Sequence, residues 1–193
     1  MMATRQPPFR LELGAIVVRR HATADGPALA RHADDRRVAD NLRDAFPHPY
    51  TVSDAESYIL RLEANPAPTS LLITVDGDPC GGIGYVPGTD VERVGAEVGY
   101  WLGAEYWGRG VMSHVLSAFS AEVFRRHAEF ERLFALPFAG NAASARVLEK
   151  AGYVREGTLR RAVIKNGVVL DQHLYALLRR ARRSTGARRP RGG

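Results

Sequence analysis

The sequence Trp107-Gly108-Arg109-Gly110-Val111-Met112 joins a predicted strand to a predicted amphipathic helix. The first backbone N–H groups of a helix have no partner inside it, and they lie at the positive end of the helix dipole. Glycine has no Cβ, so a phosphate can approach the backbone closely at positions 108 and 110. The loop therefore predicts a binding site for a phosphorylated ligand. The alternative is a tight turn between strand and helix with no ligand.

Hydrophobic periodicity on both sides of this loop predicts a regular series of strands and helices. We expect strands at 15–20, 70–75, 80–86, 94–102, 132–138, 153–164 and 168–178, and helices at 25–37, 52–64, 111–127 and 141–150. Ser53 is expected to cap the second helix, with Glu56 at the capping-box spacing, and Asn141 is expected to cap the fourth. The pair Asn166-Gly167 predicts a tight hairpin turn. The fold class expected is α/β, with a mixed, largely antiparallel sheet of about seven strands flanked by about four helices.

The length and composition predict a single domain. The chain has 193 residues and 45% apolar content, which suffices for one hydrophobic core. We expect an N-terminal extension over 1–9, the domain over 10–180 and a tail over 181–193. No apolar run is long enough to predict a membrane span. Cys80 is the only cysteine, so neither a disulfide nor a cysteine metal site is expected, and a cytoplasmic location is favoured.

The net charge of +6 comes from the C-terminal end of the chain. Seven arginines and no acidic residue lie between 179 and 193, and without them the 27 basic residues fall to 20 against 21 acidic ones. We expect this tail to be disordered. It could bind RNA weakly through phosphate attraction, but a solvated tail with no partner is the favoured interpretation.

Four segments together resemble the GCN5-related N-acetyltransferase superfamily, and within it the RimJ/RimL-like ribosomal-protein acetyltransferases. They are the strand at 96–102, the loop at 106–112, the run from Asn141 to Tyr153, and a closing hairpin that holds Glu156-Gly157, Asn166-Gly167 and Asp171. The resemblance covers roughly residues 10–180. A nucleoside-triphosphate loop is not indicated, because the chain has no G-x-x-x-x-G-K-[ST] sequence.

The resemblance implies acetyl-CoA as acetyl donor and a primary amine as acceptor, with no metal. Backbone groups of one strand would pair with the pantetheine arm, and the loop amides would hold the pyrophosphate. The cofactor-binding residues it implies are Val98, Tyr100, Leu102, Trp107, Gly108, Arg109, Gly110, Val111, Met112, Ser113, Asn141 and Ser144. Trp107 departs from the Gln or Arg that is usual in the superfamily at that position.

Two residues are the catalytic candidates. Glu97 is the candidate base, acting through a water, because it is a carboxylate in an otherwise apolar strand. Ser144 is the candidate that holds or protonates the CoA sulfur. Many members of the superfamily have a tyrosine for that task where this chain has Leu148. The alternatives are a solvated strand residue for Glu97 and an ordinary first-turn helix residue for Ser144.

The acceptor site is predicted less directly. Phe46, His48 and Tyr50 are expected to form one wall, and Arg160 and Arg161 another. An α-amine has a pKa near 8 and a lysine near 10.4, so a protein N-terminus loses its proton more easily. A small amine such as an antibiotic, amino acid or polyamine is the alternative acceptor, and a non-catalytic acyl-CoA-binding module is the alternative function. Similar proteins are often homodimers.

Overall fold

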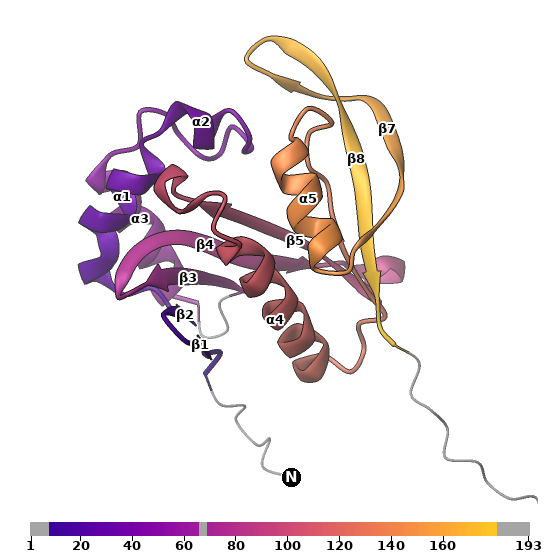
Figure 1. The fold of residues 1–193 in the computed structure, drawn as a ribbon, viewed down its shortest axis with the longest axis horizontal. Helices are drawn as coiled ribbons and strands as arrows, with labels where there is room; N and C mark the ends of the chain where they lie inside the picture. The colour runs from indigo at the N-terminus through magenta and orange to yellow at the C-terminus, as the bar shows by residue number, and fades with distance from the viewer. Residues whose placement is uncertain (1–7, 66–68, 181–193) are drawn as a thin grey trace, which may run out of the picture.

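The computed structural model describes residues 8–65 and 69–180, which form an α/β fold of eight strands and five α-helices (Figure 1). The strands are β1 Leu11–Leu13, β2 Ile16–Arg19, β3 Ser70–Val75, β4 Asp78–Pro87, β5 Gly95–Leu102, β6 Arg132–Ala135, β7 Val154–Lys165 and β8 Val168–Leu178. The helices are α1 Gly26–Ala33, α2 Arg36–Ala39, α3 Val52–Glu63, α4 Val111–Arg126 and α5 Ala142–Lys150, with 3₁₀ turns at Thr23–Asp25, Asp90–Glu92 and Ala104–Tyr106. The predicted fold class is confirmed, with one strand and one helix more than expected.

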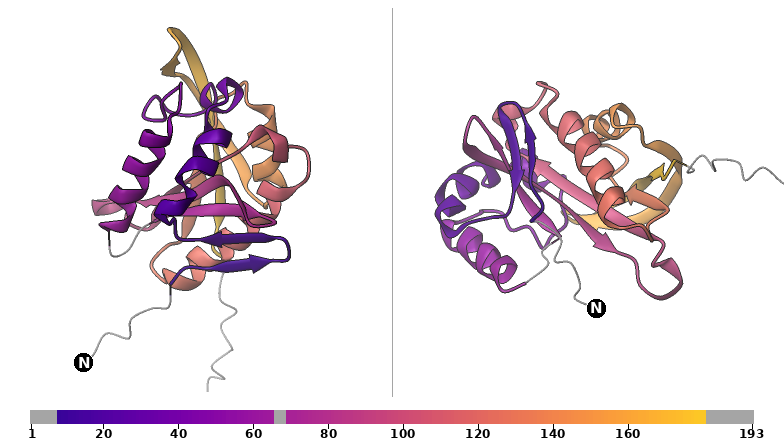
Figure 2. Two further views of the ribbon diagram at one scale, coloured as in Figure 1. Left: turned by 90° about the vertical axis from the view of Figure 1, so that its left-hand side faces the viewer. Right: turned by 90° about the horizontal axis from the view of Figure 1, so that it is seen from below.

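All eight strands form one sheet in the order β1-β2-β3-β4-β5-β6-β8-β7. Neighbouring strands are antiparallel except β5 and β6, which are parallel. Helices α1 and α3 lie on one face of the sheet, and α4 and α5 lie on the other (Figures 1 and 2). The sheet is therefore sandwiched, and its one parallel pair lies near the middle.

The main core lies between the sheet and α4. The predicted apolar stripe of this helix is buried, and Val115 and Phe119 are completely inaccessible to solvent. They belong to one cluster with Val98 and Leu102 of β5. Burying a side chain of this size stabilises a fold by about 1.5–3 kcal/mol. This packing fixes α4 against β5, and so fixes the loop that joins them.

The helix predicted over 25–37 is interrupted in the structure. Helix α1 ends at Ala33, and α2 begins at Arg36 after an extended Asp35. The carboxylate of Asp35 accepts a hydrogen bond from the Arg37 backbone N–H at 2.8 Å and so caps the new helix. Asp34 accepts one from the Tyr50 N–H at 2.9 Å. The Asp35 bond is the kind of local bond that aspartate forms in place of a continuous helix, while the Asp34 bond reaches a residue sixteen positions later, and the two together account for the break.

Two smaller expectations were also wrong. The cap of α3 is Thr51, with Asp54 completing the capping box, so the predicted cap at Ser53 is two residues too late. Strand β1 was not predicted because three residues are too few to show an alternating pattern. It pairs with β2 across Gly14, which has a φ of +69°.

The hairpin predicted at Asn166-Gly167 is confirmed, and both residues have positive φ, as its turn type requires. Figure 1 shows this hairpin of β7 and β8 rising from the sheet and leaning toward α2. Lys165 Nζ lies 2.8 Å from Asp44 Oδ1, and Asn166 Nδ2 donates to Asp40 Oδ1 at 2.9 Å. We call these four residues, Asp40, Asp44, Lys165 and Asn166, the clasp.

The ends of the domain are anchored to its core. The ring of Phe9 packs at a tilt against that of Phe119 with centroids 5.2 Å apart, and Arg179 donates to the carbonyl oxygens of Phe124, His127 and Phe130. The predicted tail over 181–193 and most of the predicted extension over 1–9 lie outside the described residues. Within the described part of the chain, no helix is both long and apolar enough to cross a membrane.

Candidate functional site

Strands β5 and β6 part soon after they meet. Their pairing covers only Gly95 to Glu97 on the β5 side, although β5 continues to Leu102. Beyond Ala135 the chain follows β8 instead, with the His173 N–H donating to the Pro137 carbonyl at 3.0 Å. Proline has no N–H to offer to a strand on its other side. An edge of β5 is therefore open beyond Glu97.

The backbone groups along this open edge can be assigned from the strand alternation. The Val94 carbonyl accepts a hydrogen bond from the Glu131 N–H at 2.6 Å, so Val94 faces β6. Every second residue faces the same way, which points the backbone groups of Val98 and Tyr100 into the gap. The carbonyl of Leu102 accepts a bond from the Trp107 indole N–H at 2.7 Å. The indole therefore caps the end of β5.

The glycine loop has the geometry that the sequence predicts. Gly108 and Gly110 have φ values of +76° and +77°, in the left-handed region that favours glycine. Helix α4 starts directly after Gly110, and its first turn carries no acidic residue. The first backbone bond of the helix runs from the His114 N–H to the Gly110 carbonyl at 3.1 Å. The preceding N–H groups, of Val111, Met112 and Ser113, suit an anion.

The carboxylate of Asp78 helps to hold this loop in place. Asp78 accepts a hydrogen bond from the Tyr106 hydroxyl at 2.7 Å, and its Oδ2 lies 2.8 Å from His32 Nε2. Burial opposes the charge of Asp78, but the hydrogen bonds from Tyr106 and His32 outweigh it and lower the pKa of Asp78. The carboxylate therefore ties α1 and the turn before Trp107 to the start of β4.

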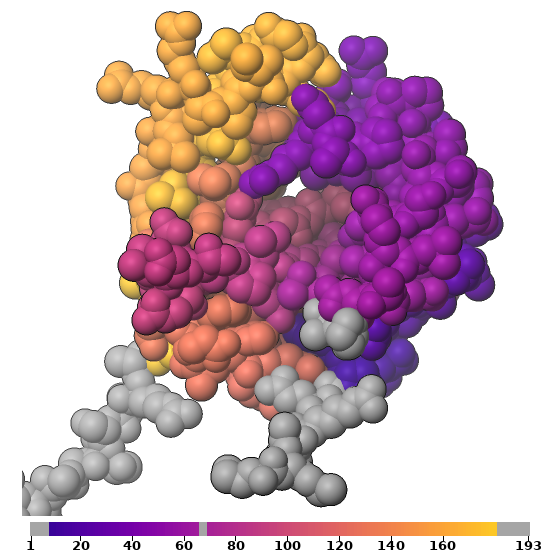
Figure 3. Space-filling model, turned by 180° about the vertical axis from the view of Figure 1, so that it is seen from behind, coloured from indigo at the N-terminus to yellow at the C-terminus, as the bar shows by residue number. Residues whose placement is uncertain are grey.

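The open edge and the loop border one cavity of about 530 Å³. In Figure 3 the molecule is hollowed between the purple N-terminal segments and the rose-coloured middle of the chain. Twelve of the predicted site residues line the cavity: Glu97, Val98, Tyr100, Leu102, Trp107, Gly108, Gly110, Val111, Met112, Ser113, Asn141 and Ser144. Arg109 is not in the lining, since its guanidinium lies over the Tyr106 ring at 5.5 Å.

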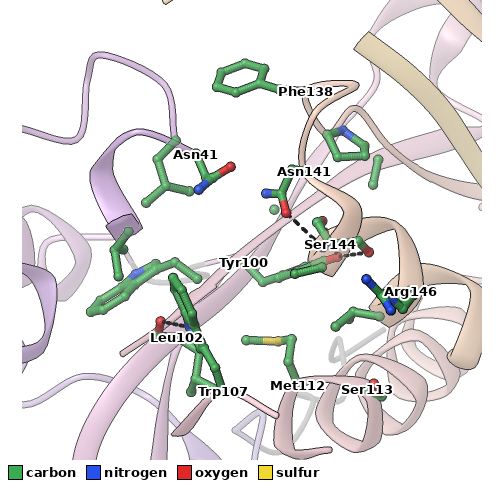
Figure 4. A pocket seen from close by; sticks show the side chains of 18 of the residues that line it. Asn41, Tyr100, Leu102, Trp107, Met112, Ser113, Phe138, Asn141, Ser144 and Arg146 are labelled. Carbon is green, nitrogen blue, oxygen red and sulfur yellow. Dashed lines mark hydrogen bonds between the residues drawn. The ribbon is translucent and has the colours of Figure 1, made fainter. Parts of the chain in front are cut away.

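Tyr100 and α5 meet inside this cavity (Figure 4). The hydroxyl oxygens of Tyr100 and Ser144 are 2.8 Å apart, and Tyr100 also donates to the Ser144 carbonyl at 3.3 Å. Asn141 caps α5 by accepting from the Ser144 N–H at 2.9 Å, as predicted. Burial raises the pKa of Tyr100 above its usual value, so its hydroxyl stays protonated. Either hydroxyl can donate in the 2.8 Å bond, and in the arrangement where Tyr100 donates to Oγ the Ser144 proton can point into the cavity.

Glu97 lies where β5 and β6 part, opposite Phe134 in the register. Its side chain is 28% exposed and faces the helices on the α1 side of the sheet, where its carboxylate forms an ion pair with Arg43. Sequence reasoning did not identify Arg43 as a site residue.

The predicted acceptor walls lie away from the cavity lining. Phe46 packs between Tyr50 and Trp101, with ring centroids 4.8 and 5.4 Å from it, so these rings support β5 from behind. His48 Nδ1 is 3.4 Å from Asp34. Arg160 and Arg161 stand on β7, outside the lining. The cavity wall on this side comes instead from Arg37, Val38, Asn41, Leu42 and Arg43.

Other lining residues were also missed by sequence reasoning. They come from α5 and from the segment between β6 and α5, together with one buried residue of β8: Arg146, Val147, Lys150, Pro137, Phe138 and Gln172. The one available signal was helical periodicity, because Val147 lies three residues after Ser144 and Lys150 three residues after Val147. Within the described residues, no group of three potential metal ligands lies close together.

Comparison with known proteins gives a consistent family. The acetyltransferase (GNAT) domain model matches residues 15–154. A putative ribosomal N-acetyltransferase of Bacillus subtilis, YdaF, is 32% identical over 105 residues, which are 54% of this chain and 56% of the relative. A ribosomal-protein-serine acetyltransferase of Escherichia coli is 32% identical over 42% of this chain and 45% of the relative. These matches span about half the length of either relative.

Solved structures share the whole fold. RimL, an alpha-N-protein acetyltransferase in complex with coenzyme A, superposes with a TM-score of 0.77 at 19% identity, covering 88% of this chain and 98% of that one. Mycobacterium smegmatis RimJ, solved with a CoA disulfide, has a TM-score of 0.74 at 22% identity over 84% and 81% of the two chains. With a domain model matching most of its length and the split sheet described above, the chain belongs to the acetyltransferase (GNAT) domain family.

Proposed function

We propose that this protein is an acetyl-CoA-dependent N-acetyltransferase whose acceptor is a primary α-amine. The observation that carries the proposal is a single cavity that joins the start of α4, the open edge of β5 and the carboxylate of Glu97. One end can hold an anion, the middle can pair with an amide-bearing chain, and the other end presents a carboxylate and a serine hydroxyl.

The donor fits this cavity end to end. The pyrophosphate of CoA would accept hydrogen bonds from the N–H groups at the start of α4. Its pantetheine arm would lie along β5 and pair with Val98 and Tyr100 as an added strand does. The five residue steps from Leu102 back to Glu97 span roughly 16 Å at about 3.3 Å per step. Arg146 and Lys150 line the cavity from α5 and supply positive charge for the phosphates.

The residues at the far end support direct transfer. The amine nitrogen attacks the thioester carbonyl, the carbon–sulfur bond breaks, the amine loses a proton and the sulfur gains one. Glu97 would take the amine proton through a water, as the candidate base. Ser144, with its Oγ oriented by Tyr100, would donate to the departing sulfur. Leu148, at the position of the tyrosine in many relatives, is fully buried in the core and cannot do so.

A protein or peptide N-terminus is the acceptor that we favour. The curated relatives described above include proteins named for ribosomal-protein acetylation, and an α-amine is deprotonated more easily than a lysine. The test is thiol release from acetyl-CoA with a panel of peptides, amino acids and polyamines, beside CoA binding measured by calorimetry. Acetylation of a peptide α-amine is the expected result. CoA binding without turnover of any amine would instead indicate a non-catalytic module.

A further inference from the structure

Charge around the cavity is strongly unbalanced. Its described lining holds four cationic side chains, Arg37, Arg43, Arg146 and Lys150, against one anionic side chain, Glu97. Arg146 and Lys150 belong to α5, while the Arg37 guanidinium lies 5.8 Å from the centre of the Trp107 ring, beside the glycine loop. That leaves Arg43 as the cation beside Glu97, where the acceptor amine has to arrive.

Arg37 and Arg43 differ in how they are held. Arg37 is fixed by Asp35, which accepts from its Nε at 3.0 Å and from its second terminal nitrogen at 2.6 Å. The Arg43 side chain is 72% exposed, and among the described residues its guanidinium bonds to the carboxylate of Glu97. The nearby acids of the clasp are engaged elsewhere, Asp44 by Lys165 and Asp40 by Asn166. Arg43 can therefore swing away once Glu97 has another partner.

An arriving amine creates that situation. Its ammonium form can replace the guanidinium at Glu97 without changing the charge around the carboxylate. The displaced guanidinium is then available to a new anionic partner, and its planar donors suit a carboxylate or phosphate. An acceptor that carries such a group near its amine satisfies both side chains together. A neutral acceptor leaves Arg43 to the solvent and gains no charge-assisted bond from it.

We propose that Arg43 is a specificity residue that selects acceptors with an acidic group close to the reacting amine. The acid is either the α-carboxylate of a free amino acid or an acidic side chain next to a peptide N-terminus. The proposal rests on the N-acetyltransferase function proposed above, and it names the acceptor chemistry of the same site.

Two matched probe pairs test it. The peptide Ala-Asp-Ala amide is compared with Ala-Asn-Ala amide, and free alanine with alaninamide, by kcat/KM at saturating acetyl-CoA. The wild-type protein should prefer the acidic member of at least one pair by about tenfold, as expected for a charge-assisted bond at a partly exposed site. The pair that shows the preference identifies the source of the acid. Added salt should reduce it, because the guanidinium is solvent-accessible.

The variants separate a direct effect from a general one. Arg43→Ala should bring the ratio close to 1, Arg43→Lys should retain part of it, and Arg93→Ala, an exposed arginine in the β4–β5 turn, should leave it unchanged. A ratio near 1 in the wild-type protein, or an undiminished ratio in Arg43→Ala, overturns the proposal even while acetylation proceeds. If no amine is acetylated, the proposed function fails separately, and calorimetry of the same probes with CoA-loaded protein still decides whether Arg43 selects the acid.

Discussion

Replacing Tyr100 by phenylalanine removes one oxygen atom from the cavity and tests the role given to Ser144. The lost bond joins the two hydroxyls at 2.8 Å, inside the lining of the cavity. A neutral hydrogen bond of this kind is worth about 1 kcal/mol net. If that energy orients Ser144 toward the departing sulfur, kcat should fall roughly five- to tenfold. The affinity for CoA should change little, because Tyr100 is expected to hold the pantetheine arm through its backbone.

The fold supplies a matched control. Tyr153 is also a buried tyrosine whose hydroxyl lies 2.9 Å from that of a helical serine, Ser120, but this pair lies outside the cavity lining. Tyr153→Phe should lower the free energy of unfolding about as much as Tyr100→Phe does, near 1 kcal/mol, without lowering kcat. The two variants together separate a loss of stability from a loss of chemistry.

The assay is thiol release at saturating acetyl-CoA and saturating amine, measured from pH 6 to 10. Burial raises the pKa of Tyr100, so the ratio of wild-type to Tyr100→Phe activity should stay constant across neutral pH. Full activity in Tyr100→Phe, or an equal loss of kcat in Tyr153→Phe, would refute the orientation of Ser144 by Tyr100.

Three further variants test other parts of the structure. Gly110→Ala places a Cβ at a φ of +77°, where no neighbouring atom is in the way, so backbone strain alone should cost about 1–2 kcal/mol and lower Tm by several degrees. Gly110→Asn should cost less, and equal Tm values for the two variants would contradict this explanation. Burial lowers the pKa of His21 to about 4, so the contribution of His21 to stability is complete above pH 6.5 and is lost as the pH falls toward 4, at most about 3 kcal/mol. The free energy of unfolding of His21→Leu, measured in urea, should therefore fall less over this pH range than that of the wild-type protein. The same pH dependence in both proteins would exclude His21 as the cause. Lys165→Met removes the ion pair of the clasp. Because Asp44 is 78% exposed, the free energy of unfolding should fall by less than about 1 kcal/mol, while backbone hydrogen exchange over 40–44 should become faster. Unaltered exchange would show that the clasp does not hold this segment.

The parts of the fold that the sequence predicted correctly are specified by nearby residues. The glycines of the loop, the Asn141 cap and the Asn166-Gly167 turn each fix a local backbone conformation, and all three are present as predicted. The break after Ala33 could not be found in this way, because it depends on Asp34 bonding to the backbone of Tyr50, sixteen residues later. Helical periodicity continues across that break and predicts one helix where the structure has two.

The same difference between nearby and distant determinants applies to the candidate site. Most of the residues predicted for the donor line the cavity, because one strand, one loop and one helix cap carry them, and their contacts to the donor stay a prediction. Arg43 was missed, since it becomes a site residue only when the segment after α2 folds against β5 and places it beside Glu97, 54 residues away. Phe46 and Tyr50 were expected at the acceptor because they lie in that same loop, but their rings pack under Trp101.

The two sides of the cavity also differ in what a substitution can change. On the donor side most of the proposed contacts are backbone N–H and carbonyl groups, which any sequence able to form the loop and the split sheet provides. On the acceptor side the wall is made of side chains from α2 and the residues after it, a segment whose position is held by the clasp and by Asp34. Exchanging Asn41 or Arg43 should therefore alter the choice of amine while CoA binding persists. A chain of this family can in this way keep its donor and acquire a different acceptor.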